Sequence, residues 1–152
     1  MDEAALWRDT PEVTGGCQCG AVQYRLAAGR TKATICHCRM CQRAMGAPFA
    51  AFLETPRTSV EWHGTPARFA SSNKAERGFC AACGTPLFFA FHDSASIELT
   101  AGSLPRDFPY APVRQHGIES RHGWINDIAE LPALETYSTG VTSTQAPEND
   151  GA

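Results

Sequence analysis

The sequence lacks any long run of apolar residues. A helix needs about 20 predominantly apolar residues to cross a bilayer, and no stretch of the 152 residues approaches that length. The opening residues, MDEAALWRDT, begin with acidic side chains and contain no apolar core of the kind that a secretory signal peptide carries. We therefore expect no contact with a membrane and a cytoplasmic location.

The sequence also has little positive charge. Its 13 lysines and arginines are outnumbered by 16 acidic residues, and none of them gather in a basic run. Because binding to phosphate backbones depends on a basic surface, we do not expect nucleic acid as a partner. Small molecules remain as partners, and the chain is expected to be a monomer or a homodimer.

Helical periodicity is scarce as well. Short alternating or apolar stretches are separated by glycine and proline, a pattern that favours an all-β or mostly β fold. The clearest stretches are 21–26, 34–36, 48–53, 87–91 and 97–99. Residues 60–62 are expected to form a further strand that pairs in a hairpin with 67–70. One helical turn is expected at residues 41–45, ended by Gly46.

Composition divides the chain into three parts. Residues 1–11 are expected to be a flexible lead-in, and residues 12–137 a single domain large enough to bury a core. Residues 138–152 are small and polar and contain no lysine or arginine. We expect this last part to be a disordered tail.

Cysteine is the residue that stands out by its placement. All seven cysteines fall into three short clusters. The clusters are Cys17 with Cys19, then Cys36 with Cys38 and Cys41, then Cys80 with Cys83. An odd number does not suit a disulfide framework, and closely spaced cysteines in a reducing cytoplasm are typical of metal ligands.

The first and last clusters predict a structural zinc site. Structural zinc takes four ligands, and two cysteines at close spacing can turn both sulfurs toward one ion. A glycine directly after each pair, Gly20 and Gly84, lets the backbone turn without a Cβ clash. The expected ligands of this closed site are Cys17, Cys19, Cys80 and Cys83.

Cys36, Cys38 and Cys41 then remain for a second zinc. Three protein ligands leave one position open, which is typical of a catalytic zinc. Three thiolates give such a site a net charge of about −1 and weaken zinc as a Lewis acid for making hydroxide. The site instead suits a substrate thiol that is held deprotonated as the fourth ligand and acts as a nucleophile. We therefore interpret these three cysteines as the catalytic centre.

Two other metal arrangements stay open at this point. One is a single zinc ribbon that leaves three thiols spare, with the ligands Cys38, Cys41, Cys80 and Cys83. In the other, a histidine closes the middle site as a fourth ligand and makes it structural. His37 is the nearest histidine, but it lies between ligands, where an extended segment would point it away.

Three motifs together resemble a known family. Residues 16–24 are GCQCGAVQY, residues 36–43 are CHCRMCQR with GAPF at 46–49, and residues 77–87 are RGFCAACGTPL. The set is similar to the signatures of the glutathione-dependent formaldehyde-activating enzyme (GFA) family, whose domain is shared with centromere protein V. The likeness extends over about residues 12–137.

The resemblance implies an Mss4-like fold of several short coiled β-sheets stapled by zinc. It implies the same division of the cysteines into a closed site of four thiolates and an open site of three. It also implies a carbon–sulfur lyase that condenses formaldehyde with glutathione to S-(hydroxymethyl)glutathione.

The expected substrates are a glutathione-like thiol and formaldehyde or another small carbonyl compound. Arg39 is a candidate for binding a substrate carboxylate, Phe49 for the wall of an apolar pocket, and Ser72 for polar contacts. Two non-catalytic functions stay open as alternatives. One is a protein-interaction module, which the acidic charge balance disfavours for chromatin, and the other is a thiol or metal sensor.

Overall fold

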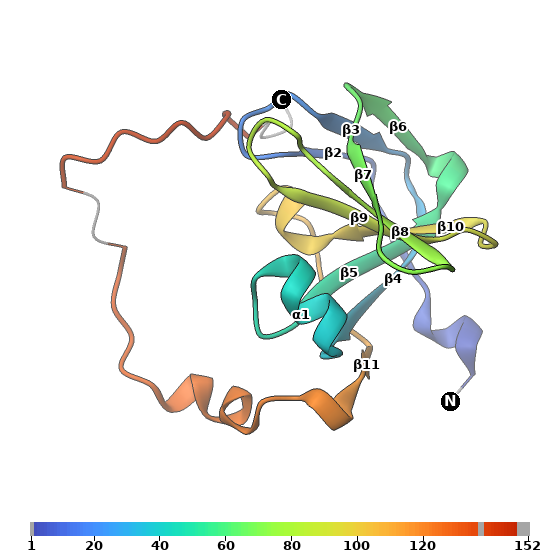
Figure 1. Cartoon of the computed structure of the whole chain (residues 1–152). Coiled ribbons are helices and arrows are strands. Elements are labelled where there is room, and N and C mark those ends of the chain that lie inside the picture. The colour runs from blue at the N-terminus through green and yellow to red at the C-terminus, as the bar shows by residue number, and fades with distance from the viewer. Residues whose placement is uncertain (1, 137–138, 149–152) are drawn as a thin grey trace.

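The computed structural model of the protein describes residues 2–136 and 139–148. Within them the chain forms eleven strands, one α-helix and several 3-10 segments (Figure 1). The strands are β1 (Arg8–Thr10), β2 (Val13–Gly16), β3 (Gln23–Leu26), β4 (Gly29–Cys36), β5 (Ala50–Pro56), β6 (Val60–His63), β7 (Ala67–Ala70), β8 (Ala75–Phe79), β9 (Pro86–Phe91), β10 (Ser96–Thr100) and β11 (Arg114–His116). The helix is α1 (Arg39–Met45), and the 3-10 segments are Glu3–Leu6, Arg57–Ser59, Ala101–Ser103, Ile118–Ser120 and Gly123–Glu130.

Two sheets make up the fold. The larger has eight strands in the order β1-β4-β5-β10-β9-β8-β7, with β11 beside β4 in parallel, and the smaller has the order β2-β3-β6. The other pairings of the larger sheet are antiparallel, and short connections join β7 to β8, β8 to β9 and β9 to β10. The predicted mostly β fold is confirmed.

One expected strand pairing is wrong. β6 does not join β7 in a hairpin but pairs with β3, where Tyr24 lies opposite Trp62 and their rings meet edge to face at 5.3 Å. β7 pairs instead with β8 in the larger sheet. Residues 64–66, Gly-Thr-Pro, have the composition of a hairpin turn, but they carry the chain from one sheet to the other. Burial of Trp62 against Tyr24 outweighs the local turn signal.

The main core packs side chains of both sheets together. Tyr24 and Leu26 of β3 are fully buried there against Leu53, Leu87 and Leu99 of the larger sheet. Because successive side chains of a strand point to opposite faces, the residues next to each of these leucines along its strand project from the other side of the larger sheet. That second face carries the candidate site.

Both ends of the described chain contact the domain. Residues 3–10, expected to belong to a lead-in, form a 3-10 turn and strand β1, which pairs with β4, and Leu6 is buried. At the other end, the Ala146 amide donates a hydrogen bond to the Gln18 carbonyl at 2.7 Å. Figure 1 shows the chain running around the outside of the molecule before this contact.

The limits at residues 12 and 137 stay predictions. Residues 1, 137, 138 and 149–152 lie outside the described part of the chain. Disorder of the tail is likewise a prediction. Among the described residues, no helix is both long and apolar enough to cross a membrane.

Candidate functional site

The first cysteine group joins two loops that lie far apart in the sequence. Its four sulfurs all lie within 4.8 Å of one another, and the members are Cys17, Cys19, Cys80 and Cys83. The Cys19 sulfur lies 3.7 Å from that of Cys17 and 3.8 Å from that of Cys80. A tetrahedral zinc with zinc–sulfur bonds of about 2.3 Å places its sulfurs about 3.8 Å apart. The group therefore fits a metal site of four thiolates.

Backbone turns after each cysteine pair orient the sulfurs of this group. Gly20 and Gly84 both adopt left-handed φ angles, +79° and +77°, which side chains with a Cβ rarely adopt. The Val22 amide donates to the Cys17 sulfur at 3.3 Å. Thr85 hydrogen-bonds Cys83 through its hydroxyl group at 3.2 Å and lowers the pKa of this thiol to about 5. These donors favour thiolates, the form that a metal needs.

The second group lies where β4 meets α1. It consists of Cys36 at the end of β4, Cys38 as the N-cap of α1, and Cys41 in the helix, with all three sulfurs within 4.8 Å of one another. The Cys38 sulfur accepts a hydrogen bond from the Cys41 amide at 3.4 Å. The helix ends at Gly46 in a left-handed conformation, as predicted. These three thiols could hold a metal ion with one coordination position left for another ligand.

His37 is held away from this group. Its ring Nε2 lies 2.9 Å from Gln115 Oε1, and its ring makes an edge contact with that of Phe49, with 5.7 Å between the ring centroids. The His37 amide donates to the carbonyl of His116 on β11. The cysteine grouping and this orientation favour two separate metal sites over the single-ribbon and histidine-closed arrangements.

Arg77 contacts the three-cysteine group from the far end of the sheet. Its guanidinium Nη2 donates to the Cys41 sulfur at 3.3 Å, its Nε donates to the Ser71 hydroxyl at 3.0 Å, and it lies 4.9 Å from the centre of the Phe89 ring. The residue is only 8% exposed. Hydrogen bonding from Cys36, together with Arg77, lowers the pKa of Cys41 to about 5.

A cavity of about 460 Å³ opens beside the three-cysteine group. The three cysteines line it together with residues from the second face of the larger sheet, which forms its floor. Phe52, Phe89 and Phe91 give this floor an apolar surface, so that the thiols face a partly water-excluding space.

A row of side chains crosses the cavity floor in strand register. The pairings place, on successive strands, Lys32, Glu54, Glu98, Phe89 and Arg77. Lys32 lies 2.8 Å from a Glu54 oxygen and 2.7 Å from Glu3. Glu98 has no such cation among the described residues. Burial, and then the nearby negative charges of Glu54 and Cys41, raise the pKa of Glu98 to about 7.

The comparison with protein families agrees with this geometry. The model of the family described as glutathione-dependent formaldehyde-activating enzyme matches residues 12–119. This chain belongs to that family.

The chain is also similar to a curated protein and to a solved structure. A Schizosaccharomyces pombe protein named "Uncharacterized lyase C29B12.13" is 40% identical over 81 residues, which are 53% of this chain and 59% of the relative. The matched region thus spans less than two thirds of that relative. A crystal structure of a Rhodobacter sphaeroides protein has a TM-score of 0.50 and 20% identity, covering 67% of this chain and 98% of that one. At this identity the likeness concerns the fold alone.

The three residues expected to bind substrate lie in three separate places. Ser72 lines the cavity beside the thiols. Arg39 lines a separate hollow on the other side of α1 and donates to the side chain of Gln42. Phe49 packs against His37, while Phe52 takes a place on the cavity floor. The roles in substrate binding stay predictions, and the structure brings only Ser72 to the thiols.

Sequence analysis did not single out Arg77, Glu54 or Glu98 as functional residues. Arg77 is visible as part of the RGFC motif, but nothing local connects it to Cys41, 36 residues away in the sequence. Glu98 alternates with Ile97 and Leu99, a pattern typical of a solvent-facing residue on a half-buried strand. Only the pairing of strands shows that this face is covered.

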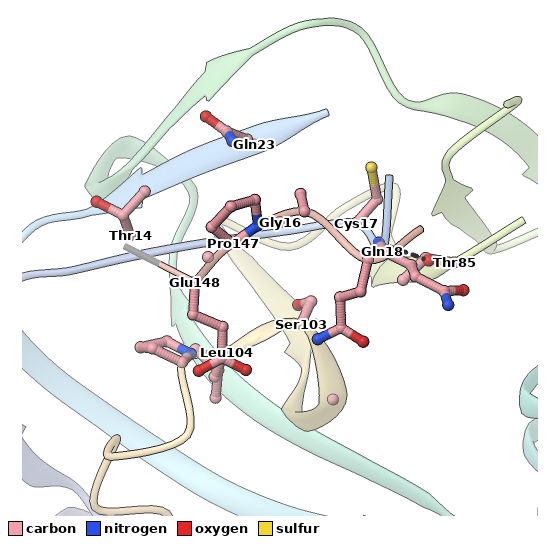
Figure 2. Close-up of a pocket in the computed structure, with 15 residues that line it drawn as sticks. Thr14, Gly16, Cys17, Gln18, Gln23, Thr85, Ser103, Leu104, Pro147 and Glu148 are labelled. Atoms are coloured by element: carbon pink, nitrogen blue, oxygen red, sulfur yellow. Dashed lines mark hydrogen bonds between the residues drawn. The ribbon is translucent and has the colours of Figure 1, made fainter. Parts of the chain in front are cut away.

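Another hollow lies beside the four-cysteine group. It has a volume of about 210 Å³ and is lined by Cys17, Gln18 and Thr85, with Pro147 and Glu148 of the C-terminal segment along its side (Figure 2). The Gln18 amide donates to the Thr85 hydroxyl at 3.0 Å, which ties the two cysteine loops together. Of the four-cysteine group, Cys17 is the member that lines this hollow.

Proposed function

We propose that this chain is a zinc-dependent carbon–sulfur lyase of the cytoplasm that joins a small thiol, such as glutathione, to formaldehyde or another small carbonyl compound. One observation carries the proposal: three free cysteines, with room for one more ligand, open into a cavity of about 460 Å³. Membership of the GFA family and the relative named as a lyase support the same class of reaction.

The reaction is an addition without change of oxidation state. The substrate thiol loses its proton, its sulfur forms a bond to the carbonyl carbon, and the carbonyl π electrons move to oxygen, which takes up a proton. The product is a hydroxymethyl thioether when the carbonyl compound is formaldehyde. Zinc held by Cys36, Cys38 and Cys41 would supply the positive charge that keeps a substrate thiol deprotonated at neutral pH.

The chain's own residues have three tasks in this proposal. Arg77 donates to the Cys41 sulfur and fixes its orientation, as groups around a metal ligand commonly do. Phe52 and Phe89 limit water on the cavity floor, which strengthens electrostatic interactions near the thiols. Ser72 offers a hydroxyl group beside the cavity for a polar part of the substrate. Cys17, Cys19, Cys80 and Cys83 would hold a second zinc with a structural role, because these cysteines bring together the loops around residues 17–20 and 80–85.

The test is the rate at which thiol, aldehyde and adduct interconvert, measured by exchange NMR at equilibrium with enzyme-free samples as the reference. The wild-type protein should accelerate exchange with at least one pair of thiol and small aldehyde. Cys38→Ala should abolish the acceleration while the four-cysteine group still binds one zinc, which serves as the control for folding. Full exchange activity in Cys38→Ala would contradict the proposed centre. A wild-type protein that accelerates no pair, yet releases zinc on mild oxidation, would point to a sensor instead.

A further inference from the structure

Two carboxyl groups lie side by side on the cavity floor in unequal surroundings. Glu54 of β5 and Glu98 of β10 are direct cross-strand partners and line the same cavity as the three thiols. The ammonium group of Lys32 lies 2.8 Å from Glu54 and favours the ionised form of that carboxyl group. Among the described residues, no lysine, arginine or histidine forms an ion pair with Glu98. Two adjacent carboxyl groups of which only one is paired with a cation favour one ionised and one protonated group.

The other strands around Glu98 give it no compensating charge. On β9 its cross-strand partner is Phe89, an apolar ring, and the guanidinium of Arg77 lies beyond that ring, engaged with Cys41 and Ser71. Four charged groups act on Glu98, each from a different element: Glu54 of β5, Cys41 of α1, Lys32 of β4 and Arg77 of β8. Burial and the two negative groups act more strongly than the two cations and raise the pKa of Glu98 to about 7. A carboxyl group in this state can both give and regain a proton near neutral pH.

The addition of a thiol to a carbonyl compound needs such a group at this place. As the carbon–sulfur bond forms, negative charge develops on the carbonyl oxygen, and a positioned acid lowers the barrier by supplying a proton. Glu98 lines the same cavity as the three thiols, so its carboxyl group borders the space that a carbonyl compound beside a bound thiol would enter. The proton need not leave the site, because the substrate thiol releases one for each that the oxygen takes up.

We propose that Glu98 is a catalytic residue of this reaction, whose carboxyl group donates a proton to the carbonyl oxygen during addition and whose carboxylate takes it back from the hydroxyl group during cleavage. The inference rests on the proposed function and assigns the proton transfer within it. Glu54, which is ion-paired with Lys32, adds a neighbouring negative charge that, together with burial, favours the protonated form of Glu98; it is a positioning residue.

The test compares Glu98→Gln with Glu76→Gln. Glutamine keeps the size of a protonated glutamate but cannot donate the proton. Glu76 of β8 is ion-paired with Arg68 and is not among the residues that line the cavity. In the exchange assay, Glu98→Gln should lower the maximal rate by about 100-fold with little change in the thiol concentration for half-maximal rate. Glu98→Asp should recover part of the rate, and Glu76→Gln should match the wild type.

The pH profile separates proton transfer from a structural role. The wild-type rate should fall as the pH rises above about 7, where Glu98 loses its proton, and the residual rate of Glu98→Gln should lack this fall. A rate for Glu98→Gln within twofold of the wild type would overturn the assignment. The assignment would also be overturned if Glu98→Gln raised the thiol concentration for half-maximal rate and left the maximal rate unchanged. Glu98 would then be a binding group for a cationic substrate.

A measurement that needs no activity distinguishes failure of the proposed function from failure of the Glu98 assignment. Carbon NMR of the labelled Glu98 carboxyl, assigned by its loss in Glu98→Gln, reports its protonation directly. An active wild type with Glu98 already ionised at pH 6 overturns the proton-donor assignment alone. A wild type without exchange activity, whatever the state of Glu98, overturns both the lyase and the assignment.

Discussion

Replacing Arg77 by methionine should weaken metal binding at the three-cysteine group and leave the four-cysteine group unchanged. The guanidinium donates to the Cys41 sulfur at 3.3 Å and to Ser71 at 3.0 Å, and it lies over the Phe89 ring. Methionine keeps the apolar stem of the side chain and the contact with the ring. The change therefore removes the charge and its hydrogen bonds while leaving most of the packing.

The size of the effect follows from these contacts. A hydrogen bond to a charged group contributes about 1.5–3 kcal/mol, and loss of a partner that orients a metal ligand lowers affinity by about 10–100-fold. Removing Arg77 also removes the desolvation cost of a buried cation, which offsets part of the loss. We expect a net loss of about 2 kcal/mol, which corresponds to about a 30-fold lower affinity.

The assay is a competition titration with a chromogenic zinc chelator, which resolves a tight and a weaker site in the same sample. Arg68→Met is the matched control, because Arg68 also lies over a phenylalanine ring, that of Phe88 at 5.3 Å, and is ion-paired with Glu76. It belongs to β7 and has no thiol partner among the described residues. An unchanged affinity of the weaker site in Arg77→Met, or an equal loss in Arg68→Met, would refute the role given to the Cys41 contact.

Three further changes have defined outcomes. Tyr24→Phe removes a buried hydroxyl 2.9 Å from the Ser103 hydroxyl and should lower the free energy of unfolding by about 1 kcal/mol in urea titrations; no change would mean that Ser103 finds another partner. Gly117→Ala puts a Cβ 2.6 Å from the Cys38 amide nitrogen at a φ of +64° and should impair zinc binding at the three-cysteine group alone, as measured by zinc content, whereas loss at both groups would indicate general unfolding. The raised pKa of Glu98, about 7, means that the folded state binds this proton more tightly than the unfolded chain, so stability is lost as the pH rises from about 4.5 to above 7, by about 3 kcal/mol in all. Glu98→Gln should remove this loss, seen as a gain over the wild type at pH 8 that disappears at pH 4; a gain independent of pH would contradict it.

The cysteine groups could be predicted from sequence because their information is local. Two cysteines separated by one or two residues and followed by a glycine can turn both sulfurs to one side, whatever the rest of the fold does. The pairing of Cys17 and Cys19 with Cys80 and Cys83 followed from counting ligands. The short helix at Cys41 was likewise predictable, because Gly46 ends it with a left-handed residue.

The cavity could not be predicted in the same way because it depends on strand pairing. Glu98 faces the thiols only because β10 lies between β5 and β9, and Arg77 reaches Cys41 only because β8 follows β9 at that edge. The hairpin expected between β6 and β7 failed for the same reason. A turn sequence such as Gly-Thr-Pro at residues 64–66 predicts that the chain bends. The partner of each strand is decided by the packing of side chains such as Trp62.

Zinc content of freshly reduced protein tests the central claim most directly. The account predicts two zinc ions per chain in the wild type and one in Cys36→Ser, with the remaining ion as tightly bound as the tighter one in the wild type. One zinc per chain in the wild type, unchanged in Cys36→Ser, would contradict the account. It would leave only the four-cysteine site and remove the centre on which the lyase proposal depends.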